Sequence, residues 1–360
     1  MPHRMIVTIA SLLVVCLLNS PASAAKIVLV AGGGTAGDGS LATQAKLDSP
    51  FGVEFDRGGN LILVEMTGHH VRRIDGRGVI TTIGGTGEKG HSGDNGPAAK
   101  ATFNGMHNLA IAADGSIYLA DTWNNCVRRI DPQSGVITIV VGTGKKGFSG
   151  DGGPATKAEF GGIYCASLDP RSEKLYLADL DNRRIRVVDL KTGVVTTVAG
   201  NGMKGVPEDG AVATNSPLVD PRAVAADKAG NVYVLERGGH ALRVVSPDGT
   251  IRTVVGTGKA GLSGDGGNAR EATMNGPKHL CLDHDGTVLI ADTENHIIRR
   301  YSPATGKIDR VAGIGRKGTA GVGGDPLQIE MNQPHGVFVH STGVLYITDS
   351  SNHRILRIEK

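Results

Sequence analysis

Several residue types are scarce in this sequence, and their scarcity excludes whole classes of protein. Four of the 360 residues are cysteines, and three of these follow residue 24: Cys126, Cys165 and Cys281. An odd number of cysteines does not form a disulfide framework, and their spacing matches no zinc or haem signature. Aromatic residues make up only 4% of the chain, which leaves few platforms on which bases could stack. We therefore expect neither a disulfide-stabilised miniprotein nor a nucleic-acid-binding protein, and we interpret the three thiols as buried side chains.

Strong net charge and long hydrophobic runs are also lacking. The formal net charge of +3 is too small to indicate a polyanionic partner. Paired basic residues such as Arg128-Arg129 lie in strand-like runs, where neighbouring side chains point to opposite faces, so one pair cannot form one patch. No segment after residue 24 is apolar enough to cross a membrane, and none shows a sustained helical period. We expect no transmembrane segment in the mature chain.

The first 24 residues have the pattern of a signal peptide. Arg4 supplies a positive charge, Met5 to Leu18 form a short apolar run, and Ala22-Ser23-Ala24 is a small-x-small cleavage site. Residues 1–24 are therefore predicted to be removed near Ala24-Ala25. We expect the mature chain to be secreted or periplasmic.

The chain is rich in glycine, with 54 residues, and it contains a regular internal repeat. An alternating apolar run that ends in an acidic residue, such as Ile117-Tyr118-Leu119-Ala120-Asp121, occurs six times. The six acidic residues are Glu65, Asp121, Asp179, Glu236, Asp292 and Asp349, with spacings of 56, 58, 57, 56 and 57. A period of this size is typical of solenoids, propellers and arrays.

Each unit holds four strand-like runs separated by turn residues, which predicts an all-β, six-bladed β-propeller of four-stranded antiparallel blades over residues 25–360. The last unit has only three such runs, and Lys26 to Gly32 resembles the missing fourth strand. We therefore expect the N-terminal strand to join the C-terminal blade and close the ring. The predicted blades cover approximately residues 51–84, 107–142, 164–200, 222–256, 279–313, and 335–360 plus 26–32.

The units resemble NHL repeats along essentially the whole chain after residue 24. The Asn-His pair before a strand occurs at Asn295-His296 and at Asn352-His353, and a Pro-x-Gly lead occurs at Pro50-Phe51-Gly52. The resemblance implies the propeller fold, but one fold hosts many activities.

The loops between units carry aspartates that recur with the same period. They lack the alternating acidic spacing of a calcium loop, so we interpret each carboxylate as an acceptor of backbone N–H groups that fixes its own turn. These residues are Asp38, Asp94, Asp151, Asp209, Asp265 and Asp325.

The residue before each inner strand is the main candidate for a ligand site. By repeat symmetry these residues ring the central channel at one height, and His279 adjoins one of them. The six are Phe51, His107, Tyr164, Arg222, Lys278 and His335. A cationic ring at a concave mouth favours a polar or anionic ligand. The leading hypothesis is a binding module, rather than an enzyme, that holds a protein, peptide or glycan on its loop-bearing face.

The alternative is a propeller lyase or hydrolase with its site at the same mouth. A distant similarity to peptidyl-amidating lyases implies a zinc site, with His107 and His335 as weak metal candidates and Tyr164 and Arg222 as catalytic candidates beside them. Arg222 stands where a third histidine ligand would fall. Gluconolactonase-type propellers bind calcium, but the inner strands show no cage of acidic ligands. Zinc and calcium are thus the candidate cofactors, and neither is firmly implied. An architectural module without a ligand site is the third hypothesis.

Overall fold

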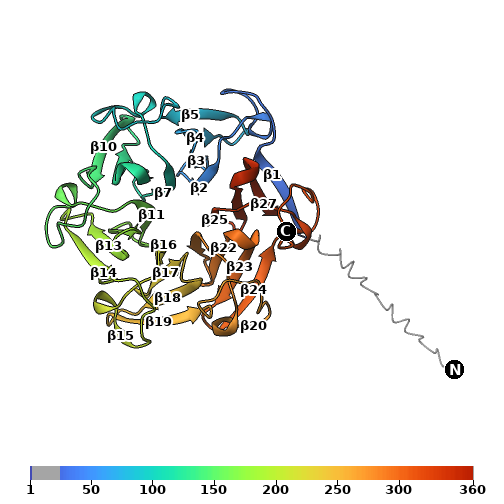
Figure 1. The fold of residues 1–360 in the computed structure, drawn as a ribbon. Coiled ribbons are helices and arrows are strands. Elements are labelled where there is room, and N and C mark those ends of the chain that lie inside the picture. Colours follow the sequence, from blue (N-terminus) through green and yellow to red (C-terminus); the bar gives the residue numbers. More distant parts are fainter. Residues whose placement is uncertain (2–24, 360) are drawn as a thin grey trace.

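The computed structural model describes Met1 and residues 25–359, so all of the predicted signal peptide except Met1 lies outside the described residues. In the described part, six antiparallel sheets stand around a central channel, as Figure 1 shows. The predicted six-bladed propeller is confirmed. No helix among these residues has both the length and the apolar character needed to span a membrane.

Each blade has an inner strand at the channel and an outer strand at the periphery. The first three blades contain β2 (Pro50–Phe55), β3 (Leu61–Glu65), β4 (Val71–Ile74) and β5 (Ile80–Gly84); β7 (Met106–Ile111), β8 (Ile117–Asp121), β9 (Cys126–Ile130) and β10 (Val136–Val141); and β11 (Ile163–Leu168), β12 (Lys174–Asp179), β13 (Arg184–Asp189) and β14 (Val195–Ala199).

The other three blades repeat this arrangement. They contain β16 (Pro221–Ala226), β17 (Val232–Glu236), β18 (Ala241–Val245) and β19 (Thr250–Val255); β21 (His279–Leu282), β22 (Val288–Asp292), β23 (Ile297–Ser302) and β24 (Lys307–Ala312); and β25 (Gly336–Val339), β26 (Leu345–Asp349), β27 (Arg354–Glu359) and β1 (Lys26–Gly32).

Short elements in the connections complete the fold. Three sheets carry a fifth, two-residue strand at the outer edge: β6 (Gly96–Pro97), β15 (Ala211–Val212) and β20 (Gly267–Asn268). The 3-10 turns are η1 (Ala42–Gln44), η2 (Ala98–Lys100), η3 (Thr122–Asn124), η4 (Ala155–Lys157), η5 (Ala213–Asn215), η6 (Ala269–Glu271), η7 (Thr293–Asn295), η8 (Pro326–Gln328) and η9 (Ser350–Asn352).

The ring closes as expected, because β1 pairs with β27 and supplies the outer strand of the last blade. Ile27 lies opposite Ile358 and Leu29 opposite Leu356. The pairing leaves no open seam between the first and last blades (Figure 1).

One apolar residue in each connection is wedged between neighbouring blades. All six are at most 2% exposed: Leu47, Phe103, Phe160, Leu218, Met274 and Met331. Strands of adjacent blades also pack apolar faces against each other, so the core of the described residues consists of five apolar clusters that lie between the blades around the channel.

The repeated acidic residue at the end of each second strand is structural. Asp121 is fully buried, and it accepts a hydrogen bond from the backbone N–H of Asn104 at 2.8 Å. All six acidic residues accept such a bond from the preceding connection. Each also pairs with an arginine of the third strand, and these arginines are Arg72, Arg128, Arg186, Arg243, Arg299 and Arg354.

The prediction for the loop aspartates was wrong for five of the six. Asp94 does not fix its own turn; its carboxylate pairs with the buried guanidinium of Arg128 at 3.0 Å, 34 residues along the chain. Asp38, Asp151 and Asp265 bind Arg72, Arg186 and Arg299 in the same way. Asp209 binds Thr253 and Arg270 instead, and only Asp325 caps a local turn, at Leu327. The first arginine of each Arg-Arg pair in three blades is therefore a core residue.

Candidate functional site

The residues that precede the inner strands meet at one end of the channel, which we call the mouth. The ring of Phe51 stacks on that of His335 with centroids 4.0 Å apart, and His107 lies 5.0 Å away on the other side. Tyr164 follows at 4.8 Å from His107. The guanidinium of Arg222 lies 4.5 Å from the centre of the Tyr164 ring and donates a hydrogen bond to its carbonyl oxygen.

Lys278 is the sixth mouth residue, and its side chain is directed to a carboxylate of the neighbouring turn η7. Its ammonium lies 2.7 Å from a carboxylate oxygen of Glu294, which also accepts a hydrogen bond from Gln333. Burial lowers the pKa of Lys278, and Glu294 opposes that shift. The mouth therefore holds two cations, of which only Lys278 has an acidic partner among the described residues.

Two neutral histidines lie between these cations and Phe51. The Nδ1 atoms of His107 and His335 lie 2.7 and 2.8 Å from the carbonyl oxygens of Gly105 and Gln333. Burial lowers the pKa of both histidines well below the usual value, and the nearby cations lower it further. Each ring therefore donates its Nδ1–H to the backbone and keeps Nε2 as an acceptor.

The mouth does not fit zinc or calcium. A catalytic zinc takes three protein ligands, and the six mouth residues offer two imidazoles. Arg222 occupies the place of a third ligand, and burial lowers its pKa only to about 10, so it stays cationic at neutral pH. Calcium prefers oxygen ligands, and none of the six side chains is a carboxylate. Within residues 25–359 no group of three or more His, Cys, Asp or Glu side chains is arranged to hold a metal.

The sequence analysis missed Trp123, which lies beside the mouth. It is the only tryptophan of the chain, it is 46% exposed, and its ring centre lies 5.5 Å from that of His107. It packs on Gly105, where an added Cβ would lie 2.3 Å from a ring atom. Its place in η3, directly after the acidic end of β8, could have indicated this face of the propeller.

His279 lies deeper in the channel than the mouth residues and forms a bridge across it. Its Nε2 is 2.9 Å from Nδ2 of Asn108, on the opposite side of the ring. Asn108 also accepts a hydrogen bond from Ala166, and Val337 donates one to His279. Burial lowers the pKa of His279 to about 4, so this bridge is neutral.

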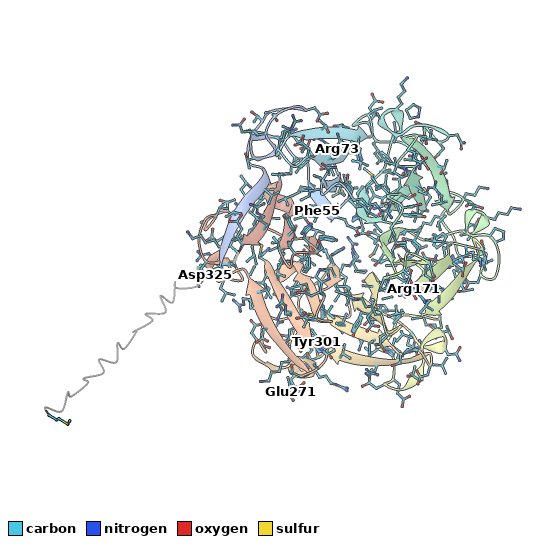
Figure 2. The ribbon with its side chains drawn as sticks, turned by 180° about the vertical axis from the view of Figure 1, so that it is seen from behind. Phe55, Arg73, Arg171, Glu271, Tyr301 and Asp325 are labelled. Carbon is cyan, nitrogen blue, oxygen red and sulfur yellow. The ribbon has the colours of Figure 1, made fainter. Side chains whose placement is uncertain are left out.

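Beyond the bridge the channel contains a cavity of about 690 Å³, which we call the chamber. Its wall consists of the inner strands, and its rim consists of the turns that follow them. Figure 2 shows Phe55, from the end of β2, beside the open centre of the ring. Burial raises the pKa values of the lining thiols Cys165 and Cys281 to about 11 and 12, so they are protonated and poor nucleophiles.

Comparison with known families agrees with this architecture. A model of the teneurin NHL domain matches residues 91–263, and a model of the NHL repeat matches residues 331–358. The chain is an NHL-repeat β-propeller.

Relatives of this NHL propeller are distant. It is 25% identical over 291 residues to the Arabidopsis thaliana protein SUPPRESSOR OF QUENCHING 1, chloroplastic, covering 78% of this chain and 27% of that protein. It is 27% identical over 345 residues to NHL repeat-containing protein 2 of Gallus gallus, covering 85% and 46%. The chain thus spans less than half the length of either relative.

A solved structure shares the fold of this NHL propeller. An auxiliary nutrient binding protein from Bacteroides thetaiotaomicron superposes with a TM-score of 0.67 at 18% identity, covering 93% of this chain and 76% of that one. At this identity the likeness establishes the fold alone.

Proposed function

We propose that this propeller is an exported binding module that holds a polar or anionic protein, peptide or glycan at its mouth. The observation that carries the proposal is the exposed face of Trp123, which lies beside His107 at a mouth that also holds Arg222 and Lys278. An exposed indole at a concave, preformed surface offers a flat contact, and nearby cations favour anionic groups. The same residues offer no activated nucleophile and no metal site, which favours binding over catalysis.

The chemistry of each mouth residue suits recognition. Nε2 of His107 is free to accept a hydrogen bond, while Lys278 and Arg222 can donate several. Because His107 and Arg222 are nearly buried, the site is already formed and loses little entropy when a ligand binds. The Bacteroides nutrient-binding protein that shares this fold is consistent with such a role.

The test is a screen of the purified mature chain against peptide and glycan arrays, followed by titration with the captured ligand. Trp123 is the only indole, so its fluorescence reports on the mouth in variants that keep it, and calorimetry measures binding by Trp123→Ala. We expect Trp123→Ala to abolish binding and Lys278→Gln to weaken it about tenfold, which is about 1.4 kcal/mol. Lys259→Gln, at an exposed lysine, is the matched control and should bind normally.

The proposal fails if Trp123→Ala and Lys278→Gln bind the captured ligand as well as the unchanged protein does. It also fails if turnover of that ligand is observed and is lost in His107→Ala. That second outcome would support the lyase or hydrolase alternative instead.

A further inference from the structure

The chamber is a second concave site, separate from the mouth. The Asn108–His279 bridge lies between the two, and none of the six mouth side chains lines the chamber. Its volume of about 690 Å³ lies within the usual range for small-molecule sites, about 300–1,000 Å³. The inner strands run from the mouth to the opposite face, so the chamber rim lies on the face away from Trp123.

The chamber wall is mostly apolar and carries a single carboxyl group, that of Glu54. The residues at the same position of the other five inner strands are Ala110, Ser167, Ala225, Cys281 and Phe338. All six line the chamber. Five of the six equivalent positions thus hold small or apolar residues, and the sixth holds an acid.

Glu54 has little compensation for its burial. One carboxylate oxygen, Oε2, accepts a hydrogen bond from the backbone N–H of Ile111 at 2.9 Å. No arginine, lysine or histidine pairs with it among the residues that the structure describes. Burial raises its pKa to about 8, which means that the site disfavours the charge in the absence of a partner. Glu54 is partly exposed to the channel, and a partly buried acid without a counter-ion is costly to keep, so it is a candidate functional group.

The rim of the chamber has the same sign of charge as Glu54. Four aspartates line it, against one lysine, Lys228; they are Asp169, Asp227, Asp283 and Asp285. Their carboxylates also accept hydrogen bonds from neighbouring backbone groups, which hold them in place at the turns. Asp283 pairs with Arg300 at 3.1 Å and Asp169 lies 3.9 Å from Arg171, so Asp227 and Asp285 carry most of the uncompensated negative charge at the rim. Together with Glu54 they favour cations at this end of the channel, whereas the mouth favours anions.

We propose that the chamber binds a small organic cation, with an ammonium group against Glu54 and an apolar or aromatic body against Leu109, Leu280 and Phe338. The free oxygen of Glu54 accepts the ammonium hydrogen bond, and its charge is then compensated in an environment of low dielectric. An anionic ligand would face five carboxylates, and a fully polar ligand would leave the apolar wall without contacts.

The probe pair is 2-phenylethylammonium and the uncharged 2-phenylethanol, which match in size and shape. Each is titrated into the purified protein by nuclear magnetic resonance, at up to about 10 mM so that weak binding is observed. We expect the ammonium compound to shift signals of the chamber residues and to bind at least tenfold more tightly than the alcohol.

Variants localise that preference. Glu54→Gln keeps an acceptor for the Ile111 N–H and removes the charge, so it should reduce the ammonium preference at least tenfold. Glu271→Gln removes the same charge from the outer edge of the propeller, where Figure 2 shows Glu271, and should change nothing. Ser167→Leu should narrow the chamber and weaken binding of both probes. Trp123→Ala should leave chamber binding intact, which separates this proposal from the one for the mouth.

Four results would overturn the inference. The ammonium and the alcohol could bind equally, Glu54→Gln could retain the ammonium preference in a protein with an unchanged melting temperature, or the ammonium could shift no chamber signals at about 10 mM. Loss of ammonium binding in Trp123→Ala, with chamber signals unmoved, would assign the probe to the mouth and would equally contradict it.

Discussion

The buried charged side chains of the blades have more ionic and hydrogen-bond partners than those of the channel. In the blades Arg128 is fully buried, and it pairs with Asp94 and Asp121 while donating to two backbone carbonyls. In the channel, buried Arg222 donates a hydrogen bond to one carbonyl oxygen and contacts one tyrosine ring, and Glu54 accepts a hydrogen bond from one N–H group. The blade charges thus hold the connections to the strands, whereas the channel charges are left available.

This difference indicates which charges serve the fold and which serve a ligand. A buried pair with all its hydrogen bonds made is tolerated by the structure, but an isolated buried charge costs stability. The channel has one such charge near each end, a cation at the mouth and an acid in the chamber. Removing a blade charge should therefore destabilise the protein, and removing a channel charge should not.

The largest expected effect is in the blades. Arg128→Met leaves Asp94 and Asp121 without their cation, and we expect it to lower the free energy of unfolding by about 3–5 kcal/mol. Chemical denaturation measures this change. Arg129→Met is the control, because that side chain is partly exposed and pairs only with Asp131; it should cost less than about 1 kcal/mol. Equal costs for the two variants would erase the distinction between the regions.

Glu54→Gln should have the opposite sign. The folded-state pKa of Glu54 is raised from 4.5 to about 8, so the folded protein loses stability as the pH rises from about 4.5 to 8. We expect Glu54→Gln to match the unchanged protein at pH 4 and to be more stable by about 4 kcal/mol at pH 8. Subtracting the two denaturation profiles cancels Asp121, Asp179 and Asp292, whose pKa values are also raised by burial, to about 6. A difference that does not depend on pH would contradict the assignment.

Arg222→Met should have a smaller effect on stability. Burial lowers the pKa of Arg222 to about 10, so its charge is disfavoured, but the lost contact with Tyr164 offsets part of the gain. We expect a stabilisation of about 1 kcal/mol together with loss of anionic ligands at the mouth. Destabilisation as large as that of Arg128→Met would mean that Arg222 is a structural residue.

The smallest effect is expected at Lys278. Its partner Glu294 is about one-third exposed, and pairs near the surface contribute about 0–1 kcal/mol. Lys278→Gln should therefore change the melting temperature little while it weakens ligand binding. A large loss of stability with unchanged binding would reverse the role given to this residue.

The fold could be predicted from the sequence because a period of 56 to 58 residues fixes both the blade and the closing strand. Counting along that period also found the six mouth residues. It missed the pairing of Asp94 with Arg128, although a constant separation of 34 residues recurs in three blades and was a usable signal. The chamber was missed because a single acid at one of six repeat positions breaks no pattern of spacing. The lack of an ionic partner for Glu54 depends on which side chains of other blades lie near it, and the sequence alone does not place those side chains.

The most direct test of the contrast between blade and channel is the titration of Glu54 itself. Protein labelled with carbon-13 at the glutamate carboxyl groups gives one signal for each glutamate, and Glu54→Gln identifies the one that matters. The account predicts a midpoint near 8 that falls when 2-phenylethylammonium is bound. A midpoint near 4.5 that is insensitive to the probe would show that Glu54 is an ordinary solvated acid, and the channel would then hold no available charge at this end.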